Sequence, residues 1–220
     1  MSGAADDRLF TPRFFVMCGF TFTVFLSALQ LLPTAPFHIH DLGGSTAASG
    51  LFLGLLTFSS AFSAPITGAL ADRYGRTRQL LVCSIAIAGF SALYAIAPTV
   101  LLLLVLVPLH GIVWSGLLSA SAAYMTSILP ASRRAEGLGY WGFASVIALA
   151  VAPPIGFWIY QFGWFWLCMF AALLNVIMAA SADSHARNSI PTLQATRRAA
   201  RHFATIAILL FARETRALPS

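Results

Sequence analysis

The chain has 220 residues, 59% of them hydrophobic and only 9% charged, and its mean hydropathy is +0.82. This composition excludes an ordinary water-soluble domain, in which about 25% of residues are charged. The length accommodates roughly six membrane-crossing helices of about 20 residues each, so the sequence predicts an all-α, polytopic membrane protein. The three cysteines have no C-x-x-C spacing, which favours packing residues over a metal site or a disulfide: Cys18, Cys83 and Cys168.

Residues 1–13 form a short polar leader, and an apolar run over about residues 14–37 follows it. The run is too long for the core of a cleaved signal peptide, so we expect a first membrane-spanning helix. Its far end carries His38, His40 and Asp41. These side chains could ligate a metal, but a solvated loop and helix end is the favoured interpretation.

Five further apolar runs follow, separated by short polar or turn-forming segments, and together with the first they predict a six-helix bundle over residues 14–182. Aromatic residues gather near the last turn, as is typical of the belt at a membrane interface. The expected spans are about 46–71, 80–97, 100–129, 139–160 and 164–182.

All 13 basic residues are arginines, and they fall on one side of the membrane if the chain crosses it six times. The loops at 38–45, 98–99 and 161–163 contain none. Because Lys and Arg concentrate in cytoplasmic loops, we predict cytoplasmic termini in a plasma (inner) membrane. The net charge of +6 therefore indicates orientation in the lipid bilayer, and no nucleic-acid partner is expected.

The most specific stretch is a charged hairpin over residues 68–80, between the second and third runs. So short a connection must reverse the chain at one membrane face, and Gly75 can supply the positive φ that the turn needs. Asp72 is the lone acid among the arginines, so it has cationic partners within reach and could also cap the next helix. The motif residues are Gly68, Asp72, Arg73, Gly75, Arg76 and Arg78.

This pattern resembles the loop signature between the second and third helices of major facilitator superfamily transporters. The resemblance implies half of that fold, with six transmembrane helices arranged as two inverted three-helix units. It also implies that the hairpin is a gate element at the cytoplasmic face. Pro153 and Gly156 retain part of the superfamily's glycine and proline signature, which implies a helix-packing role. No cofactor is implied, and proton coupling stays open because Val107 stands where many relatives carry arginine.

His110 is the only ionisable residue placed deep in a predicted span. It lies about ten residues into the fourth run, roughly 15 Å along a helix, near the middle of a hydrocarbon core about 30 Å thick. Ionisable groups at this depth are functional candidates by default, and Gln30, Trp114 and Ser115 could form a polar substrate path with it. The alternative is a neutral histidine hydrogen-bonded to a neighbouring helix.

Residues 183–220 differ from the rest and predict a cytoplasmic basic linker with an amphipathic helix. The apolar run over residues 203–212 is too short to cross a membrane. Arg197, Arg198 and Arg201 precede it, which favours a helix attracted to the anionic membrane surface. In the superfamily such a linker joins two six-helix halves.

The resulting hypothesis is a secondary transporter, of the efflux kind, that moves a small solute by alternating access. The absence of a carboxylate deep in any span slightly favours a neutral or amphipathic solute. We expect the 220-residue chain to be incomplete alone and to need a second six-helix half or a homodimer partner. The alternative is a truncated remnant or an accessory membrane subunit. An enzyme is disfavoured, because the spans hold no paired carboxylates and no H-E-x-x-H or G-x-S-x-G motif.

Overall fold

The computed structural model describes residues 8–186 and residue 205. Over these residues the fold is helical, with no strand and with one short 3-10 turn, η1, between the fourth and fifth long helices. The elements are α1 (Pro12–Asp41), α2 (Thr46–Tyr74), α3 (Arg76–Ala95), α4 (Val100–Ile128), η1 (Ala131–Arg133), α5 (Arg134–Tyr160) and α6 (Trp164–Ala186). This confirms the expected all-α class.

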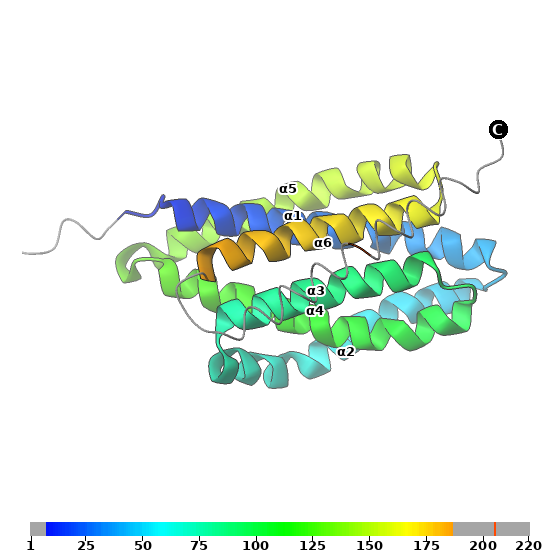
Figure 1. Ribbon diagram of the computed structural model, residues 1–220, viewed down its shortest axis with the longest axis horizontal. Coiled ribbons are helices and arrows are strands. Elements are labelled where there is room, and N and C mark those ends of the chain that lie inside the picture. The colour runs from blue at the N-terminus through cyan, green and yellow to red at the C-terminus, as the bar shows by residue number, and fades with distance from the viewer. Residues whose placement is uncertain (1–7, 187–204, 206–220) are drawn as a thin grey trace, which may run out of the picture.

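The six long helices of the described part run up and down, so that consecutive helices are antiparallel (Figure 1). The α2–α3 and α4–α5 connections lie at one end of the bundle, together with the start of α1, and we call this the hairpin end. The other three connections lie at the opposite end, the far end. The predicted clustering of the arginine-bearing connections at a single end is therefore confirmed for Arg8, Arg13, Arg73, Arg76, Arg78, Arg133 and Arg134.

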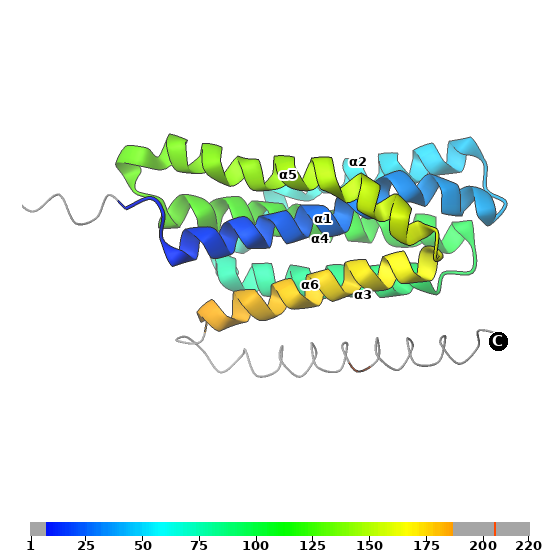
Figure 2. The same ribbon diagram turned by 90° about the horizontal axis from the view of Figure 1, so that it is seen from above.

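The helices form three layers of two (Figure 2). Helices α1 and α4 lie in the middle, α2 and α5 on one side, and α3 and α6 on the other. The most extensive contacts join α2 to α4, α3 to α6 and α1 to α5. Each helix therefore packs chiefly against a partner that is not its neighbour in the chain.

Helix starts follow ordinary capping chemistry. The side chains of Thr11, Ser45 and Thr99 accept hydrogen bonds from backbone N–H groups in the first turns of α1, α2 and α4. The turns between helices use glycines with positive φ at Gly43 (78°), Gly75 (93°) and Gly163 (114°). At these points the connections can be as short as one to four residues.

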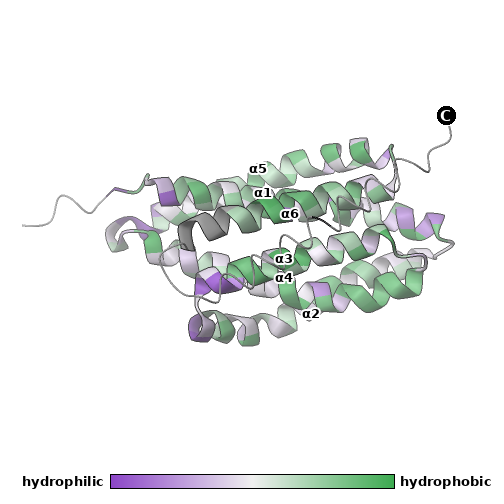
Figure 3. Ribbon diagram, in the orientation of Figure 1, coloured by the Kyte–Doolittle hydropathy of each residue, from purple (hydrophilic) through white to green (hydrophobic). Residues whose placement is uncertain are grey.

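The composition of the helices fits a membrane-embedded bundle. Among the described residues five helices, α1 to α5, are long and apolar enough to cross a bilayer, and α6 adds a shorter apolar stretch, Trp164–Ala180. The polar residues gather mainly at the two ends of the bundle, while its middle is largely apolar (Figure 3). This is the distribution that a hydrocarbon core selects.

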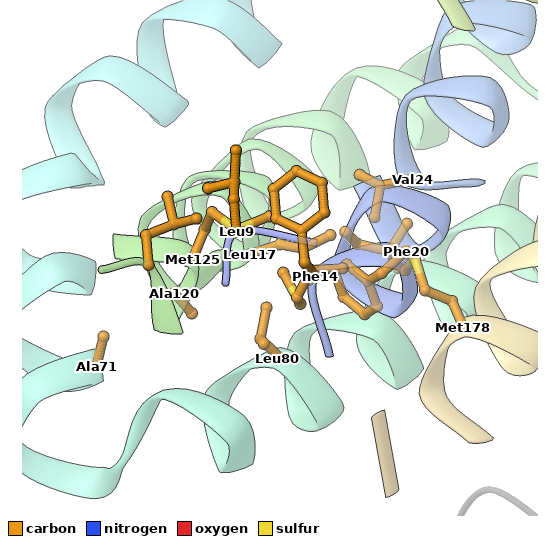
Figure 4. Packing of buried hydrophobic residues seen from close by; sticks show 13 residues of the cluster. Leu9, Phe14, Phe20, Val24, Ala71, Leu80, Leu117, Ala120, Met125 and Met178 are labelled. Carbon is orange, nitrogen blue, oxygen red and sulfur yellow. The ribbon is translucent and has the colours of Figure 1, made fainter. Parts of the chain in front are cut away.

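Two large clusters of buried apolar side chains fill the bundle, one toward each end. Near the hairpin end, residues of α1 and α4 meet Leu80 of α3 and Met178 of α6, as Figure 4 shows. Near the far end, Leu31 and Ile39 of α1 pack with Leu103 and Val107 of α4. Both clusters centre on the middle layer, which explains why α1 and α4 hold the other helices in place.

The predicted span limits need small corrections. Helix α1 continues to Asp41 instead of ending near residue 37, α3 covers Arg76–Ala95 instead of 80–97, and α5 begins at Arg134 instead of residue 139. At Asp41, Arg76 and Arg134 the apolar run marked the hydrocarbon thickness, while the helix continued into polar residues beyond it. Most of the predicted leader and almost all of the predicted linker lie outside the described residues.

Candidate functional site

The hairpin between α2 and α3 is a joint of one residue. Gly75 both ends α2 and precedes the first residue of α3, with φ 93° and ψ 132°. A side chain is strained at such a φ, although the space beside Gly75 is open. The glycine is therefore needed for backbone conformation and not for close packing.

The charged groups of the hairpin have distinct neighbours. Arg76 lies 3.7 Å from the Asp72 carboxylate and donates a 2.9 Å hydrogen bond from Nη1 to the Ala123 carbonyl on α4. Arg73 lies over the ring of Tyr74, 5.6 Å from its centroid. Arg78 is exposed, and the space around Gly68 is open. Of the motif residues, Arg76 thus makes the contact that links the hairpin to another helix.

The expectation that Asp72 caps the next helix is wrong. The N-cap of α3 is Gly75, and no side chain accepts a hydrogen bond there. Helix α2 continues through Asp72 to Tyr74, so the carboxylate belongs to the last turn of α2 and its side chain is 72% exposed. The Asp72 carboxylate therefore lies one turn before Arg76 and does not cap the backbone N–H groups at the start of α3.

A residue that the sequence did not single out, Gln79, makes two close polar contacts beside the hairpin. Its Nε2 donates to the carbonyl of Thr67 on α2 (2.9 Å) and to the carbonyl of Gly116 on α4 (3.0 Å). Next to it, the Thr67 and Ser115 hydroxyls hydrogen-bond to each other at 3.0 Å. Because Gln79 occupies a variable position of the loop pattern, the sequence alone could not predict its bonds to α2 and α4.

A pocket of about 260 Å³ lies between α1, α4 and α5, in the half of the bundle nearer the hairpin end. We call it the α1–α4–α5 pocket. Among the described residues, no charged side chain lines it. Its walls are Thr21, Val24 and Phe25 of α1, Leu118, Ser121 and Ala122 of α4, and Trp141, Gly142 and Ser145 of α5.

The polar groups of this pocket are few and mostly satisfied within the protein. The Trp141 indole N–H donates to the Thr21 hydroxyl at 2.7 Å, which joins α5 to α1. The Ser121 and Ser145 hydroxyls donate to carbonyls of their own helices, at 2.8 and 2.7 Å. Each hydroxyl oxygen keeps a lone pair for a further donor. The pocket can therefore accept a largely apolar molecule and one or two of its hydrogen-bond donors.

The predicted substrate-path residues have separate neighbours, and none of the four lines the pocket. The Nδ1 of His110 lies 3.1 Å from the Tyr94 hydroxyl of α3, and its ring stacks on Phe90. This is the arrangement of the alternative interpretation, a histidine hydrogen-bonded to a neighbouring helix. Ser115 bonds to Thr67, as described above. Trp114 packs edge-on against Phe25, so it lies behind one wall of the pocket.

Gln30 is the fourth predicted path residue and the one with an unusual environment. It is fully buried in α1, and neither amide atom has a hydrogen-bond partner in the described structure. An unpaired buried amide costs roughly 1–3 kcal/mol of stability, and a polar ligand or water that hydrogen-bonded to Gln30 would remove this cost.

Gly156, one of the two predicted packing residues, lies directly against the backbone of Gln30. A Cβ at this position would stand 2.6 Å from the Gln30 carbonyl oxygen and 2.9 Å from its Cα. Only glycine allows α5 to approach α1 so closely. Pro153 stands one turn earlier inside α5, next to Ala152, which is also fully buried.

The far end is joined by aromatic contacts. The Tyr160 hydroxyl donates to the Asp41 carboxylate at 2.6 Å, and the His38 ring stacks on Trp164 with centroids 4.4 Å apart. The expected helix end is therefore confirmed, and His40 and Asp41 are exposed, but His38 is partly buried on an aromatic ring in the last turn of α1 and not in a loop. Among the described residues, no group of three metal-ligating side chains gathers, here or elsewhere.

A bundle of long apolar helices with an uncharged, partly open pocket and a cationic hairpin at one end defines a polytopic integral membrane protein. The family model of the Major Facilitator Superfamily matches residues 14–213. The chain belongs to this superfamily, as the hairpin pattern had implied.

Several curated relatives agree with this placement. The chain is similar to the multidrug export protein EmrB of Haemophilus influenzae, with 28% identity over 63% of this chain and 28% of the relative. It is also similar to the fatty acid resistance protein FarB of Neisseria gonorrhoeae, with 26% identity over 67% of this chain and 29% of the relative. A homologue of the multi-drug resistance efflux pump PmrA in Lactococcus lactis is 30% identical over 68% of this chain and 37% of its own length. The chain thus spans about a third of these relatives.

Proposed function

We propose that the chain forms one six-helix half of a transporter that exports a small neutral or amphipathic solute by alternating access. The observation that carries this proposal is the uncharged, partly open α1–α4–α5 pocket of an apolar bundle. The names of the relatives, which speak of multidrug export, fatty acid resistance and efflux, support the direction and the kind of solute.

The lining of the pocket argues for the class of solute. An ion placed in a low-dielectric site needs a counter-charge or several strong hydrogen bonds, and the described lining offers neither. The aromatic walls Phe25 and Trp141 suit an apolar or aromatic body, and the hydroxyls of Thr21, Ser121 and Ser145 suit one or two polar groups on it.

The pairing of the helices supports two inverted three-helix units. If α1, α2 and α3 exchange places with α4, α5 and α6, the contact of α2 with α4 becomes that of α5 with α1, and the contact of α3 with α6 maps onto itself. The two contacts of intermediate extent, α3 with α4 and α1 with α6, also exchange. A two-fold relation between the units would produce this pattern.

Exposed apolar surface on α2 and α5 supports a second half. Phe58 and Phe62 of α2 have rings 4.4 Å apart and are about two-thirds exposed, and Phe143 of α5 is 61% exposed. Lipid could cover such residues, but it offers no donor to the lone pairs that the pocket hydroxyls keep open. We infer that a second six-helix unit, or a second copy of this chain, supplies the remaining wall.

For the orientation we propose that the hairpin end faces the cytoplasm, because arginines concentrate there. Cysteines placed at Asp41 and at Ser132, in a background without the native cysteines, should react with a membrane-impermeant thiol reagent from opposite sides of sealed vesicles. Reaction from the same side would contradict the six-span topology.

Uptake by proteoliposomes tests the function. Purified chain should bind neutral aromatic compounds such as radiolabelled chloramphenicol, and saturable uptake should occur only where crosslinking shows a dimer or where a second half is added. Thr21→Val should weaken the binding of the compound about 5-fold, which corresponds to the free energy of one hydrogen bond. Thr23→Val is the matched control, because Thr23 bonds to the Gly19 carbonyl of its own helix and does not line the pocket.

Two results would contradict the proposal. Saturable uptake by the crosslinking-verified monomer would remove the need for a second half. A failure of the chain to bind or move any neutral aromatic compound, with or without a partner, would favour the alternative of a non-transporting accessory subunit or remnant.

A further inference from the structure

The segment Gly116–Ala123 of α4 has two differently used sides. On one side Leu118, Ser121 and Ala122 line the α1–α4–α5 pocket. On the other side, side chains of α3 hold the backbone carbonyls at the two limits of the same segment: Gln79 bonds to the Gly116 carbonyl and Arg76 to the Ala123 carbonyl. Helix α3 therefore contacts the side of this α4 segment that faces away from the pocket.

The two contacts differ in strength and surroundings. Arg76 has a side chain that is 39% exposed, so water can replace its hydrogen bond if the hairpin moves. Gln79 is partly buried, uses both of its Nε2 protons, and reaches two helices at once, since it also bonds to the Thr67 carbonyl of α2. Arg76 also reaches α2 and α4, but its contact with α2 is a solvated ion pair of 3.7 Å with Asp72, whereas Gln79 joins α2, α3 and α4 through two hydrogen bonds of 2.9 and 3.0 Å from one nitrogen.

The packing around Gln79 leaves little room for adjustment. A Cβ at Gly116 would stand 3.0 Å from the Cys83 sulfur and 3.2 Å from the Gln79 Nε2. The hydroxyl pair of Thr67 and Ser115 lies beside this contact and joins α2 to α4 a second time. A displacement of α3 at the level of Gln79 must therefore displace α4 as well.

We propose that Gln79 is a positioning residue that couples the hairpin to the pocket: it holds the Gly116–Ala123 wall in the arrangement that binds solute, and it transmits movement of the α2–α3 hairpin to that wall. The proposal rests on the proposed function only in taking the α1–α4–α5 pocket as the solute site. It assigns a role to a variable position of the hairpin pattern, whereas Arg78, one of the characteristic positions of that pattern, is exposed.

Three variants separate this role from general stability. Gln79→Met keeps the length of the side chain but removes both donors. Gln79→Glu keeps the shape and places carboxylate oxygens against two carbonyl oxygens, so it should have the larger effect. Arg78→Gln is the matched control, because Arg78 is the exposed neighbour on the same helix.

The readout is the rate of thiol modification at two positions of α4, measured in detergent on the full chain without its native cysteines. Ala122→Cys places a thiol on the pocket wall, where Ala122 is exposed, and we call it the wall thiol. Leu101→Cys places a thiol at the far end of the same helix, where Leu101 is 71% exposed, and we call it the far-end thiol. Chloramphenicol binding is measured in parallel.

We expect both Gln79 variants to change the modification rate of the wall thiol about 5-fold or more, the value of one or two lost hydrogen bonds, with the rate of the far-end thiol unchanged. Chloramphenicol binding should weaken by a similar factor, and Arg78→Gln should keep both rates within about 2-fold, since it removes no buried hydrogen bond. If Gln79→Glu does not fold, Gln79→Met decides the matter alone.

Wall-thiol rates that match the Arg78→Gln control would overturn the proposal. Equal changes at the wall thiol and the far-end thiol would also overturn it, since Gln79 would then stabilise the whole bundle and not position the wall. Altered wall-thiol rates with chloramphenicol binding that neither Gln79 nor Thr21 variants affect would support the coupling and reject the pocket as the solute site. Loss of binding in Thr21→Val alone would support the pocket and reject Gln79.

Discussion

The two ends of the bundle are held together by different chemistry. At the hairpin end, side-chain N–H groups of Arg76 and Gln79 bond to backbone carbonyls of α2 and α4. At the far end the contacts are aromatic, with the Tyr160 hydroxyl on Asp41, His38 stacked on Trp164, and the Trp164 indole N–H donating to the Tyr94 carbonyl at 2.8 Å.

The difference also concerns which helices are joined. The polar contacts named above join α2, α3 and α4 at the hairpin end, and α1, α5 and α6, with one bond to α3, at the far end. Other contacts cross this division, such as the bond of Trp141 to Thr21 in the half nearer the hairpin end and the ring of Phe52 on Tyr94 at the far end. Opening either end would therefore break a different set of polar contacts. In the proposed alternating-access transporter the two ends would have to loosen independently, and separate sets of polar contacts would allow this.

The largest expected effect comes from Gly156→Ala in the half of α5 nearer the far end. The new methyl group would meet the Gln30 backbone at 2.6 Å, so α5 must move away from α1. We expect a loss of about 2 kcal/mol in the free energy of unfolding, typical of overpacking, measured by SDS titration in mixed micelles.

Gly139→Ala at the hairpin end of the same helix is the control for this substitution. Nothing lies within 4 Å of a Cβ at that position, so alanine should be neutral or should stabilise by up to about 1 kcal/mol through its helix propensity. Equal destabilisation by both substitutions would show that the close α1–α5 approach is not specific to Gly156.

Trp164→Phe tests the aromatic end with a smaller effect. The ring can still stack on His38, but the buried hydrogen bond to the Tyr94 carbonyl is lost. We expect a loss of about 1.5 kcal/mol in the same titration. Trp158→Phe, at a ring that is 62% exposed, should change the value by less than about 0.5 kcal/mol. A similar loss in both variants would argue against the indole hydrogen bond.

Arg76→Gln tests the charged contact of the hairpin end. The shorter, neutral side chain cannot maintain the 2.9 Å bond to the Ala123 carbonyl, but water can replace it at this partly exposed position. We expect a loss of about 1 kcal/mol, with Arg78→Gln close to zero. No measurable difference between these two arginine variants would mean that the hairpin end is held by Gln79 and apolar packing alone.

Asp72→Asn should have the smallest effect on stability. Its ion pair with Arg76 spans 3.7 Å and is largely solvated, so we expect a change below about 0.5 kcal/mol. If the hairpin is a gate element, as the resemblance to the superfamily implies, Asp72→Asn should also alter the rate at which a thiol reagent reaches the wall thiol from the hairpin side, while membrane insertion stays intact. An unchanged rate would count against the gate role of Asp72.

The order and extent of the helices could be predicted well. The starts of α2, α4 and α6 at Thr46, Val100 and Trp164, and the end of α5 at Tyr160, agree with the hydropathy of the chain. Errors occurred where polar residues extend a helix past the hydrocarbon region, as at Arg134. The superfamily was also predictable, because the hairpin pattern places acid, glycine and arginine residues at characteristic positions.

The candidate site was predictable only in part. Hydropathy placed His110 and Gln30 deep along their spans, but it could not tell that both are buried within this chain or which neighbour each would face. His110 bonds to Tyr94, Gln30 lies against Gly156, and the pocket instead uses Thr21 and Trp141, which are 120 positions apart in the chain. A serine, threonine or tryptophan in an apolar run is too common to mark a pocket in a single sequence.

By itself, then, the sequence determined how deep each residue lies along its own helix, because the bilayer and the loop charges act on each span separately. Tertiary structure alone decided how each helix is rotated and which helix it meets. That choice depends on close packing between non-neighbouring helices, such as Gly156 on Gln30 and Gly116 beside Gln79. Since small residues occur on several faces of every span, only their mutual fit selects the pairs that form the pocket and couple it to the hairpin.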